Sequence, residues 1–74
     1  MSRLTPIQPG KLEKIIVNLG FAPLRQRGSH VFYRHPDGRT TMIPFHSGYD
    51  IEPSLLQKIL KEIDLDREIF LKMR

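Results

Sequence analysis

The chain of 74 residues contains no cysteine and no tryptophan. Without cysteine it has no disulfide framework, no thiolate nucleophile and no cysteine-ligated metal, a composition that suits a reducing compartment. The longest apolar runs, such as residues 15–17, are far shorter than a membrane span, and the first residues lack the continuous apolar segment of a signal peptide. We therefore expect a cytoplasmic protein with no membrane partner.

The chain also lacks the length for a second domain. A chain of this size forms one compact domain, expected here to span residues 1–74, and it buries only about 60% of the surface that its unfolded form exposes. The short length leaves no room for a deep substrate cavity.

Acidic residues are scarce in the first 46 positions. This part holds seven basic and two acidic side chains, a net charge of +5, whereas residues 47–74 hold five basic and six acidic ones, a net charge of −1. Positive charge concentrated in one part of a fold is typical of a protein with a polyanion partner. The alternative is a solvated basic surface that only maintains solubility.

Two segments carry the apolar spacing of an amphipathic helix. Residues 9–19 repeat apolar side chains at i, i+3, i+4 and i+7, namely Leu12, Ile15, Ile16 and Leu19. Pro9 suits the first helical turn, and Gly20 suits the position just past the end. A second helix begins near Pro53 and repeats the same stripe with Leu56, Ile59, Leu60 and Ile63. Asp66 is expected to cap a short last helix that carries Ile69 and Phe70.

Three short runs between these helices are rich in β-branched and aromatic residues and predict strands at residues 22–27, 29–35 and 39–45. The sequence His35-Pro36-Asp37-Gly38 predicts a tight turn and hence an antiparallel hairpin. Gly28 is expected to form the other reversal, and Pro44 indicates that the third strand lies at a sheet edge or ends in a bulge. The prediction is an α+β fold of order α-β-β-β-α, in which both helices cover one face of a three-stranded antiparallel sheet.

The tripeptide Gly28-Ser29-His30 is the strongest candidate for a catalytic motif. Glycine allows close backbone approach, serine offers a hydroxyl, and histidine can take or give a proton near neutral pH. Arg25 and Arg27 lie just upstream, and the planar guanidinium group suits phosphate. As an isolated motif, however, His30 could serve only to fix the turn. Strand alternation places polar and apolar side chains on both faces, so the direction of His30 stays open.

The other two histidines are weaker candidates for a catalytic role. His35 adjoins the predicted turn and is interpreted as a turn residue. His46 could be a second proton carrier or, as we prefer, an anchor for the loop before the second helix. A metal site is not expected, because alternation places His30 and His35 on opposite faces of one strand.

Several short motifs occur together in this chain in a fixed order: Leu19-Gly20-Phe21, Arg25-Gln26-Arg27-Gly28-Ser29-His30, His35-Pro36-Asp37-Gly38, Ile43-Pro44-Phe45-His46 and Leu56-Gln57-Lys58-Ile59-Leu60. In this order and at these spacings the chain resembles the HicA family of mRNA interferase toxins along almost its whole length. The resemblance implies a fold like that of a double-stranded RNA-binding domain, which agrees with the order of elements predicted above.

The resemblance also implies an endoribonuclease that cleaves mRNA with the histidine at His30 and is neutralised by a HicB antitoxin. It brings no metal and no organic cofactor. On this interpretation Arg25, Arg27, Ser29 and Lys11 bind RNA, and His46 is a possible second catalytic group. Two alternatives remain: a module that binds structured RNA without cleaving it, and a degenerate relative that merely titrates an antitoxin.

Overall fold

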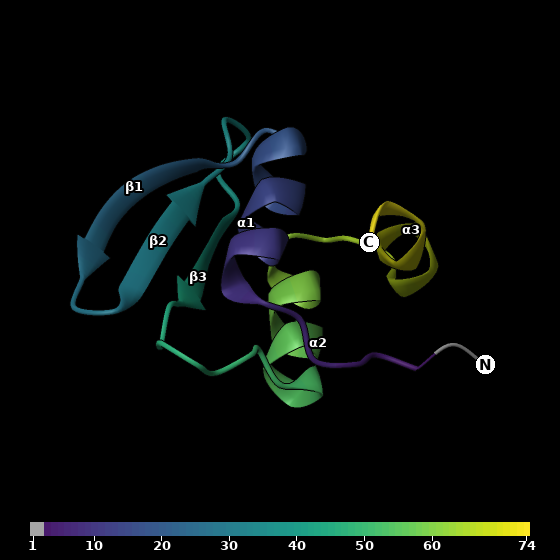
Figure 1. The fold of residues 1–74 in the computed structure, drawn as a ribbon. Helices are drawn as coiled ribbons and strands as arrows, with labels where there is room; N and C mark the ends of the chain where they lie inside the picture. The colour runs from purple at the N-terminus through teal and green to yellow at the C-terminus, as the bar shows by residue number, and fades with distance from the viewer. Residues whose placement is uncertain (1–2) are drawn as a thin grey trace.

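The computed structural model describes residues 3–74; residues 1 and 2, which belong to the expected domain, lie outside the described part. The elements follow the order α1 (Pro9–Asn18), β1 (Ala22–Arg27), β2 (His30–Arg34), β3 (Thr40–Pro44), α2 (Pro53–Glu62) and α3 (Arg67–Met73). The strands form one antiparallel sheet of order β1-β2-β3, and α1 and α2 lie together on one side of it (Figure 1). The predicted α+β arrangement is confirmed, including the short last helix.

The apolar stripes predicted for α1 and α2 supply most of the helical part of the core. Leu12, Ile15 and Ile16 of α1 are buried, as are Leu56, Ile59 and Leu60 of α2. Proline occupies the first turn of both helices, where its missing N–H costs no hydrogen bond. α1 ends one residue earlier than predicted, because Leu19 is its C-cap and Gly20 follows with a φ of +104°.

The last helix is capped as predicted and ties the ends of the chain together. The Asp66 carboxylate accepts hydrogen bonds from the backbone N–H groups of Glu68 and Ile69, at 2.8 and 3.3 Å. The apolar face of α3 packs into the core through Phe70, which is buried. After the helix, the Arg74 guanidinium donates to the backbone carbonyl of Thr5 at 2.8 Å and to that of Pro6. The two ends of the described chain are therefore joined on the helix side of the molecule (Figure 1).

The sheet is slightly shorter than the strand predictions of 29–35 and 39–45. β2 and β3 each lose one residue at both ends: Ser29 lies in a turn, whereas His35, Arg39 and Phe45 still make backbone hydrogen bonds but lie outside the strands. The turn after β2 closes as predicted, with the N–H of Gly38 donating to the carbonyl of His35 at 2.8 Å. Arg39 donates hydrogen bonds to Asp37 in this turn and holds the pKa of the Asp37 carboxyl below its usual range. β3 is an edge strand, which confirms the expectation drawn from Pro44.

The register of the sheet separates a covered face from an open one. Tyr33 of β2 pairs with Thr41 of β3 and Val31 pairs with Ile43, and Tyr33 and Ile43 have no exposed surface. The other face carries the alternate residues, including His30 and Arg34, which are exposed. Because cross-strand partners share a face, the residues paired with His30 and Arg34 also point away from the helices.

Tyr33 makes the main polar contact beneath the covered face. Its hydroxyl donates a hydrogen bond to the Glu13 carboxylate of α1. Burial, together with the neighbouring Glu13 carboxylate, raises the pKa of Tyr33 far above its ordinary value. The contact ties α1 to the central strand of the sheet.

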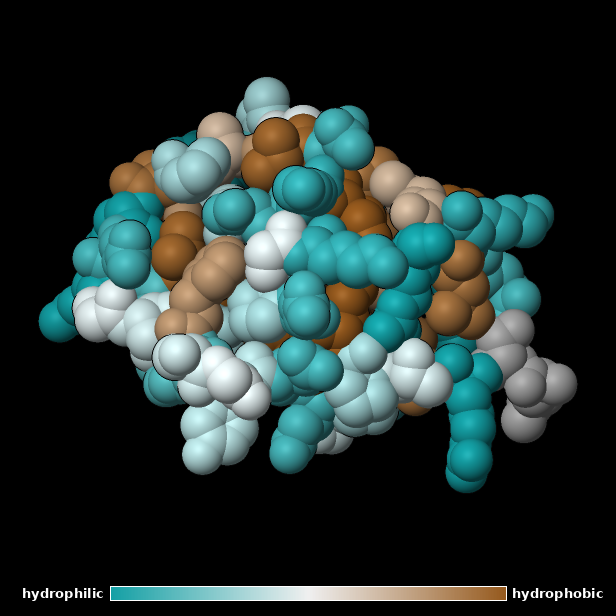
Figure 2. All heavy atoms as spheres, viewed as in Figure 1, coloured by the Kyte–Doolittle hydropathy of each residue, from teal (hydrophilic) through white to brown (hydrophobic). Residues whose placement is uncertain are grey.

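Hydrophobic atoms on the surface seen in Figure 2 lie in narrow patches between hydrophilic side chains. The largest exposed apolar or aromatic side chains of the described residues are scattered over several elements: Val17, Leu24, Tyr49, Ile69 and Met73. None of the helices in residues 3–74 is both long and apolar enough to cross a membrane.

Candidate functional site

His30 is the first residue of β2 and follows a tight reversal. Gly28 has a φ of +59°, and the Gln26 side-chain amide donates to its carbonyl at 3.0 Å, so the turn is held from β1. The side chain of His30 is exposed on the open face of the sheet. In the register its neighbours are Arg27 on β1 and Pro44 on β3. His30 is therefore accessible and has an arginine as its cross-strand partner.

His46 lies beside His30, although the two are 16 positions apart in the sequence. Since β2 and β3 run antiparallel, the start of β2 and the residues after β3 meet at the same end of the sheet. The two imidazole rings are 6.0 Å apart between centroids and almost perpendicular, at 89°. Both side chains are exposed. Two groups that can each exchange a proton near neutral pH are thus adjacent.

Ser29 connects the backbone around the two histidines. Its carbonyl accepts a hydrogen bond from the N–H of Phe45 at 2.7 Å, which continues the β2–β3 pairing past the strand ends. Its hydroxyl lies 3.4 Å from Nδ1 and 3.5 Å from Nε2 of His46, at the upper limit of hydrogen bonding. Ser29, a predicted RNA-binding residue, therefore contacts the second histidine.

The open face is cationic around His30. The three strands contain no acidic residue, and Arg25, Arg27 and Arg34 share the face with His30. The Cζ atom of Arg25 lies 5.0 Å from the centroid of the Phe32 ring, a cation–π contact that holds this arginine over the sheet. Arg34 was not among the predicted site residues, although the alternation His30, Phe32, Arg34 was visible in the sequence.

Lys11 belongs to a different part of the surface. It is exposed in the first turn of α1, in the helix layer rather than on the sheet. The preceding residue, Gly10, lines a groove of about 560 Å³ that His46 and Tyr49 also line. Lys11 thus lies near the His46 side of the site and away from the three arginines of the open face.

His35 has a structural environment that differs from that of the other two histidines. Its Nε2 lies 3.0 Å from the carbonyl of Leu19, and its Nδ1 accepts from the N–H of Asp37 at 3.1 Å. A carbonyl can only accept, so Nε2 carries a proton towards Leu19, and Nδ1 also lies 3.1 Å from a carboxylate oxygen of Asp37. The ring also packs edge-on against Phe21. Within residues 3–74 no three histidine, aspartate or glutamate side chains are grouped so that they could hold a metal ion.

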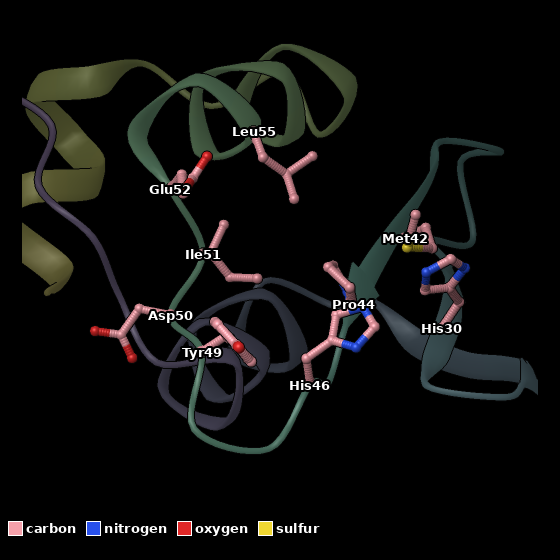
Figure 3. A pocket seen from close by; sticks show the side chains of 9 residues that line it. All are labelled: His30, Met42, Pro44, His46, Tyr49, Asp50, Ile51, Glu52 and Leu55. Carbon is pink, nitrogen blue, oxygen red and sulfur yellow. The ribbon is translucent and has the colours of Figure 1, made fainter.

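A groove of about 530 Å³ opens beside the two histidines (Figure 3). It is lined by residues of β2, β3, the following loop and the start of α2: His30, Met42, Pro44, His46, Tyr49, Asp50, Ile51, Glu52 and Leu55. The side chains of Ile51 and Leu55 point into the groove, whereas the Asp50 carboxylate points away from the other labelled groups (Figure 3). The site therefore has a cationic side on the sheet and an apolar side in the groove.

Apart from His30 and His46, the groove residues were not predicted from the sequence. Ile51 and Leu55 have no distinctive chemistry, and Met42 and Pro44 read only as strand residues. Tyr49 did carry a signal, because it is an aromatic residue within the polar segment His46-Ser47-Gly48-Tyr49-Asp50 and belongs to no apolar stripe. Such a residue has no core position to fill and is a candidate for binding.

Fold and site together define a small α+β protein with an open, cationic sheet face and an exposed histidine pair. Residues 10–65, three quarters of the chain, match the family described as the HicA toxin of bacterial toxin–antitoxin systems. The chain therefore belongs to the HicA toxin family, a family of nuclease-like toxins that are paired with an antitoxin. No curated protein matches the chain.

Proposed function

We propose that this protein is a cytoplasmic endoribonuclease that cleaves mRNA, with His30 as a catalytic residue and His46 as its partner. The observation that carries the proposal is the exposed pair of imidazole rings, 6.0 Å apart, on a face whose other charged side chains are arginines. Membership in a toxin family supports a growth-arresting role for this activity.

The chemistry needs only these side chains and the RNA. One imidazole takes the proton of the ribose 2′-hydroxyl, and the 2′-oxygen forms a bond to the adjacent phosphorus. The bond from phosphorus to the 5′-oxygen of the next nucleotide breaks, and the other histidine, as imidazolium, gives that oxygen a proton. The products are a 2′,3′-cyclic phosphate and a 5′-hydroxyl. Arg27, the cross-strand neighbour of His30, is suited to stabilise the charge that develops on the phosphate.

In this proposal Arg25, Arg27 and Ser29 hold the phosphates, and Lys11 contacts the RNA from the edge of α1. No metal and no organic cofactor takes part. The partner that neutralises the toxin is a HicB-type antitoxin, which would restrain cleavage by binding the toxin.

The test compares the wild-type chain with His30→Ala, both in purified form with an RNA and in cells after induced expression. We expect the wild type to cleave RNA in the presence of a chelator, to leave DNA of the same sequence intact and to arrest growth. His30→Ala should fold, as judged by circular dichroism, but should neither cleave nor arrest growth. An alanine variant that stays equally active would refute the role of His30. A wild-type chain that binds RNA without cleaving it would instead indicate the binding module.

A further inference from the structure

The groove beside the histidines differs in charge from the sheet face on their other side. None of its lining residues is a lysine or an arginine, and beyond the histidines its walls are largely apolar, with Met42, Pro44, Ile51 and Leu55. The arginines lie on β1 and at the far end of β2. A phosphate is therefore drawn to the sheet side of the histidine pair, and the groove suits an uncharged, flat group.

Glu52 strengthens this contrast. It lines the groove immediately before α2 and does not cap the helix with its side chain. A carboxylate in this position repels a phosphate but can accept hydrogen bonds from the amino or imino groups of a nucleobase.

Tyr49 provides a flat surface at the same groove. Its side chain is 74% exposed, the largest exposure among the large hydrophobic side chains of residues 3–74. The turn that carries it is closed by a hydrogen bond from the N–H of Tyr49 to the carbonyl of His46 at 3.1 Å, and Gly48 adopts a φ of +79°. A tyrosine placed outside the core by a hydrogen-bonded turn offers its ring for stacking.

We propose that this groove binds one unpaired nucleobase of a single-stranded RNA, stacked on Tyr49, next to the phosphate that lies between His30 and His46. The inference rests on the proposed function for the position of that phosphate. A base in a duplex has both faces stacked and its pairing edge occupied, so it cannot enter the groove. The protein therefore selects a flexible, unpaired nucleotide at the site of cleavage, despite a fold that resembles double-stranded RNA-binding domains.

The first experiment measures binding without cleavage. The probe is a short 2′-O-methyl RNA, which has no free 2′-hydroxyl, carrying one 2-aminopurine whose fluorescence falls on stacking. We expect Tyr49→Ala to weaken binding about 5- to 150-fold, the range for loss of one stacked base, and Tyr49→Phe to bind like the wild type. Ile69→Ala is the matched control, because Ile69 is also exposed, at 52%, but lies on α3.

A second measurement identifies the base itself. An abasic nucleotide is moved through the same strand one position at a time. In the wild type one position should cost the same factor in affinity as Tyr49→Ala, and in Tyr49→Ala that position should cost nothing further. A fully paired duplex of the same sequence should bind equally well to wild type and Tyr49→Ala. Equal affinity of the two proteins for the single strand, or an abasic effect that persists in Tyr49→Ala, would overturn the base site.

These outcomes separate the two proposals. If the wild type does not cleave RNA but its affinity for the single strand depends on Tyr49, the proposed function fails and the base site stands. If RNA is cleaved but Tyr49→Ala changes neither the affinity nor kcat/KM, the base site fails and the proposed function stands.

Discussion

The rings of His30 and His46 meet edge to face, with centroids 6.0 Å apart, at the end of the sheet where β2 starts and β3 has just ended. Neither position in the sequence suggests the other, and the contact depends on the pairing of His30 with Pro44. Two adjacent imidazoles can divide the work of base and acid, which a single histidine would have to perform in turn.

His46→Ala and His46→Gln should therefore both impair cleavage. We expect kcat to fall about 10²- to 10⁴-fold, as for the loss of one acid–base group, a much larger factor than any loss of affinity for a 2′-O-methyl RNA. The wild-type rate should rise and then fall with pH, because one imidazole must be neutral and the other charged. Both variants should lose one limb of that profile in single-turnover measurements. If His46→Gln cleaved RNA at the wild-type rate and with the wild-type pH dependence, His46 would have no role in proton transfer and would only anchor its loop.

RNA binding should be separable from cleavage through Arg25 and Arg27. Replacing both with glutamine should weaken binding to RNAs of unrelated sequence by similar factors, because phosphate contacts carry no sequence information. The slope of log affinity against log salt should flatten by about 0.7 for each phosphate that an arginine no longer neutralises. His30→Ala should leave the slope nearly unchanged, and Lys72→Gln on α3 serves as a control that removes one positive charge elsewhere. An unchanged slope in the arginine variant would mean that RNA lies elsewhere.

Tyr33→Phe tests the contact between α1 and the central strand. Loss of the hydroxyl removes the hydrogen bond to Glu13 and should lower the free energy of unfolding at pH 7 by about 1–2 kcal/mol. Because the pKa of Tyr33 is raised in the folded state, its contribution is complete below the ordinary tyrosine value of 10.0 and is lost as the pH rises beyond it. Urea denaturation should therefore show a steeper loss of stability above pH 10 in the wild type than in Tyr33→Phe. Tyr49→Phe, at an exposed position, should follow the wild type throughout this pH range.

Two glycines should respond in opposite ways to alanine. At Gly20 the φ is +104°, and an added Cβ would lie 2.8 Å from Nε2 of His35, the atom that contacts the Leu19 carbonyl. We expect Gly20→Ala to destabilise the protein by about 1–3 kcal/mol. At Gly10 a Cβ meets nothing within 4 Å and the residue is helical, so Gly10→Ala should stabilise by about 0.5 kcal/mol. Thermal unfolding of both variants measures these changes in stability. A Gly10→Ala variant less stable than the wild type would contradict the prediction.

Most of the fold could be predicted because its signals are local. The spacing of Leu12, Ile15 and Ile16 identifies α1, and Asp66 marks the start of α3 with a side chain that caps the helix. The predicted strands at residues 29–35 and 39–45 are each one residue longer at both ends than β2 and β3. Of those four positions only Ser29 lies in a turn, and backbone hydrogen bonds continue past the strands between Phe45 and Ser29 and between His35 and Arg39.

The site was less accessible to sequence reasoning, because it depends on contacts between distant segments. Strand alternation groups His30 with Phe32 and Arg34 but does not say whether the helices cover that group or the one with Tyr33. Burial of Tyr33 against α1 decides the question and leaves His30 exposed. The groove could not be predicted from any local pattern, because residues of β2, β3 and the start of α2 line it together.

The bonds from Arg74 to the carbonyls of Thr5 and Pro6 also have a practical consequence. They join both ends of the described chain on one side of α1 and α2, and the sheet lies on the other side of these helices (Figure 1). A protein immobilised or fused to a carrier through either end would therefore present its open sheet face outward. Surface-based measurements of RNA capture can thus be made in either orientation with the open sheet face away from the attachment.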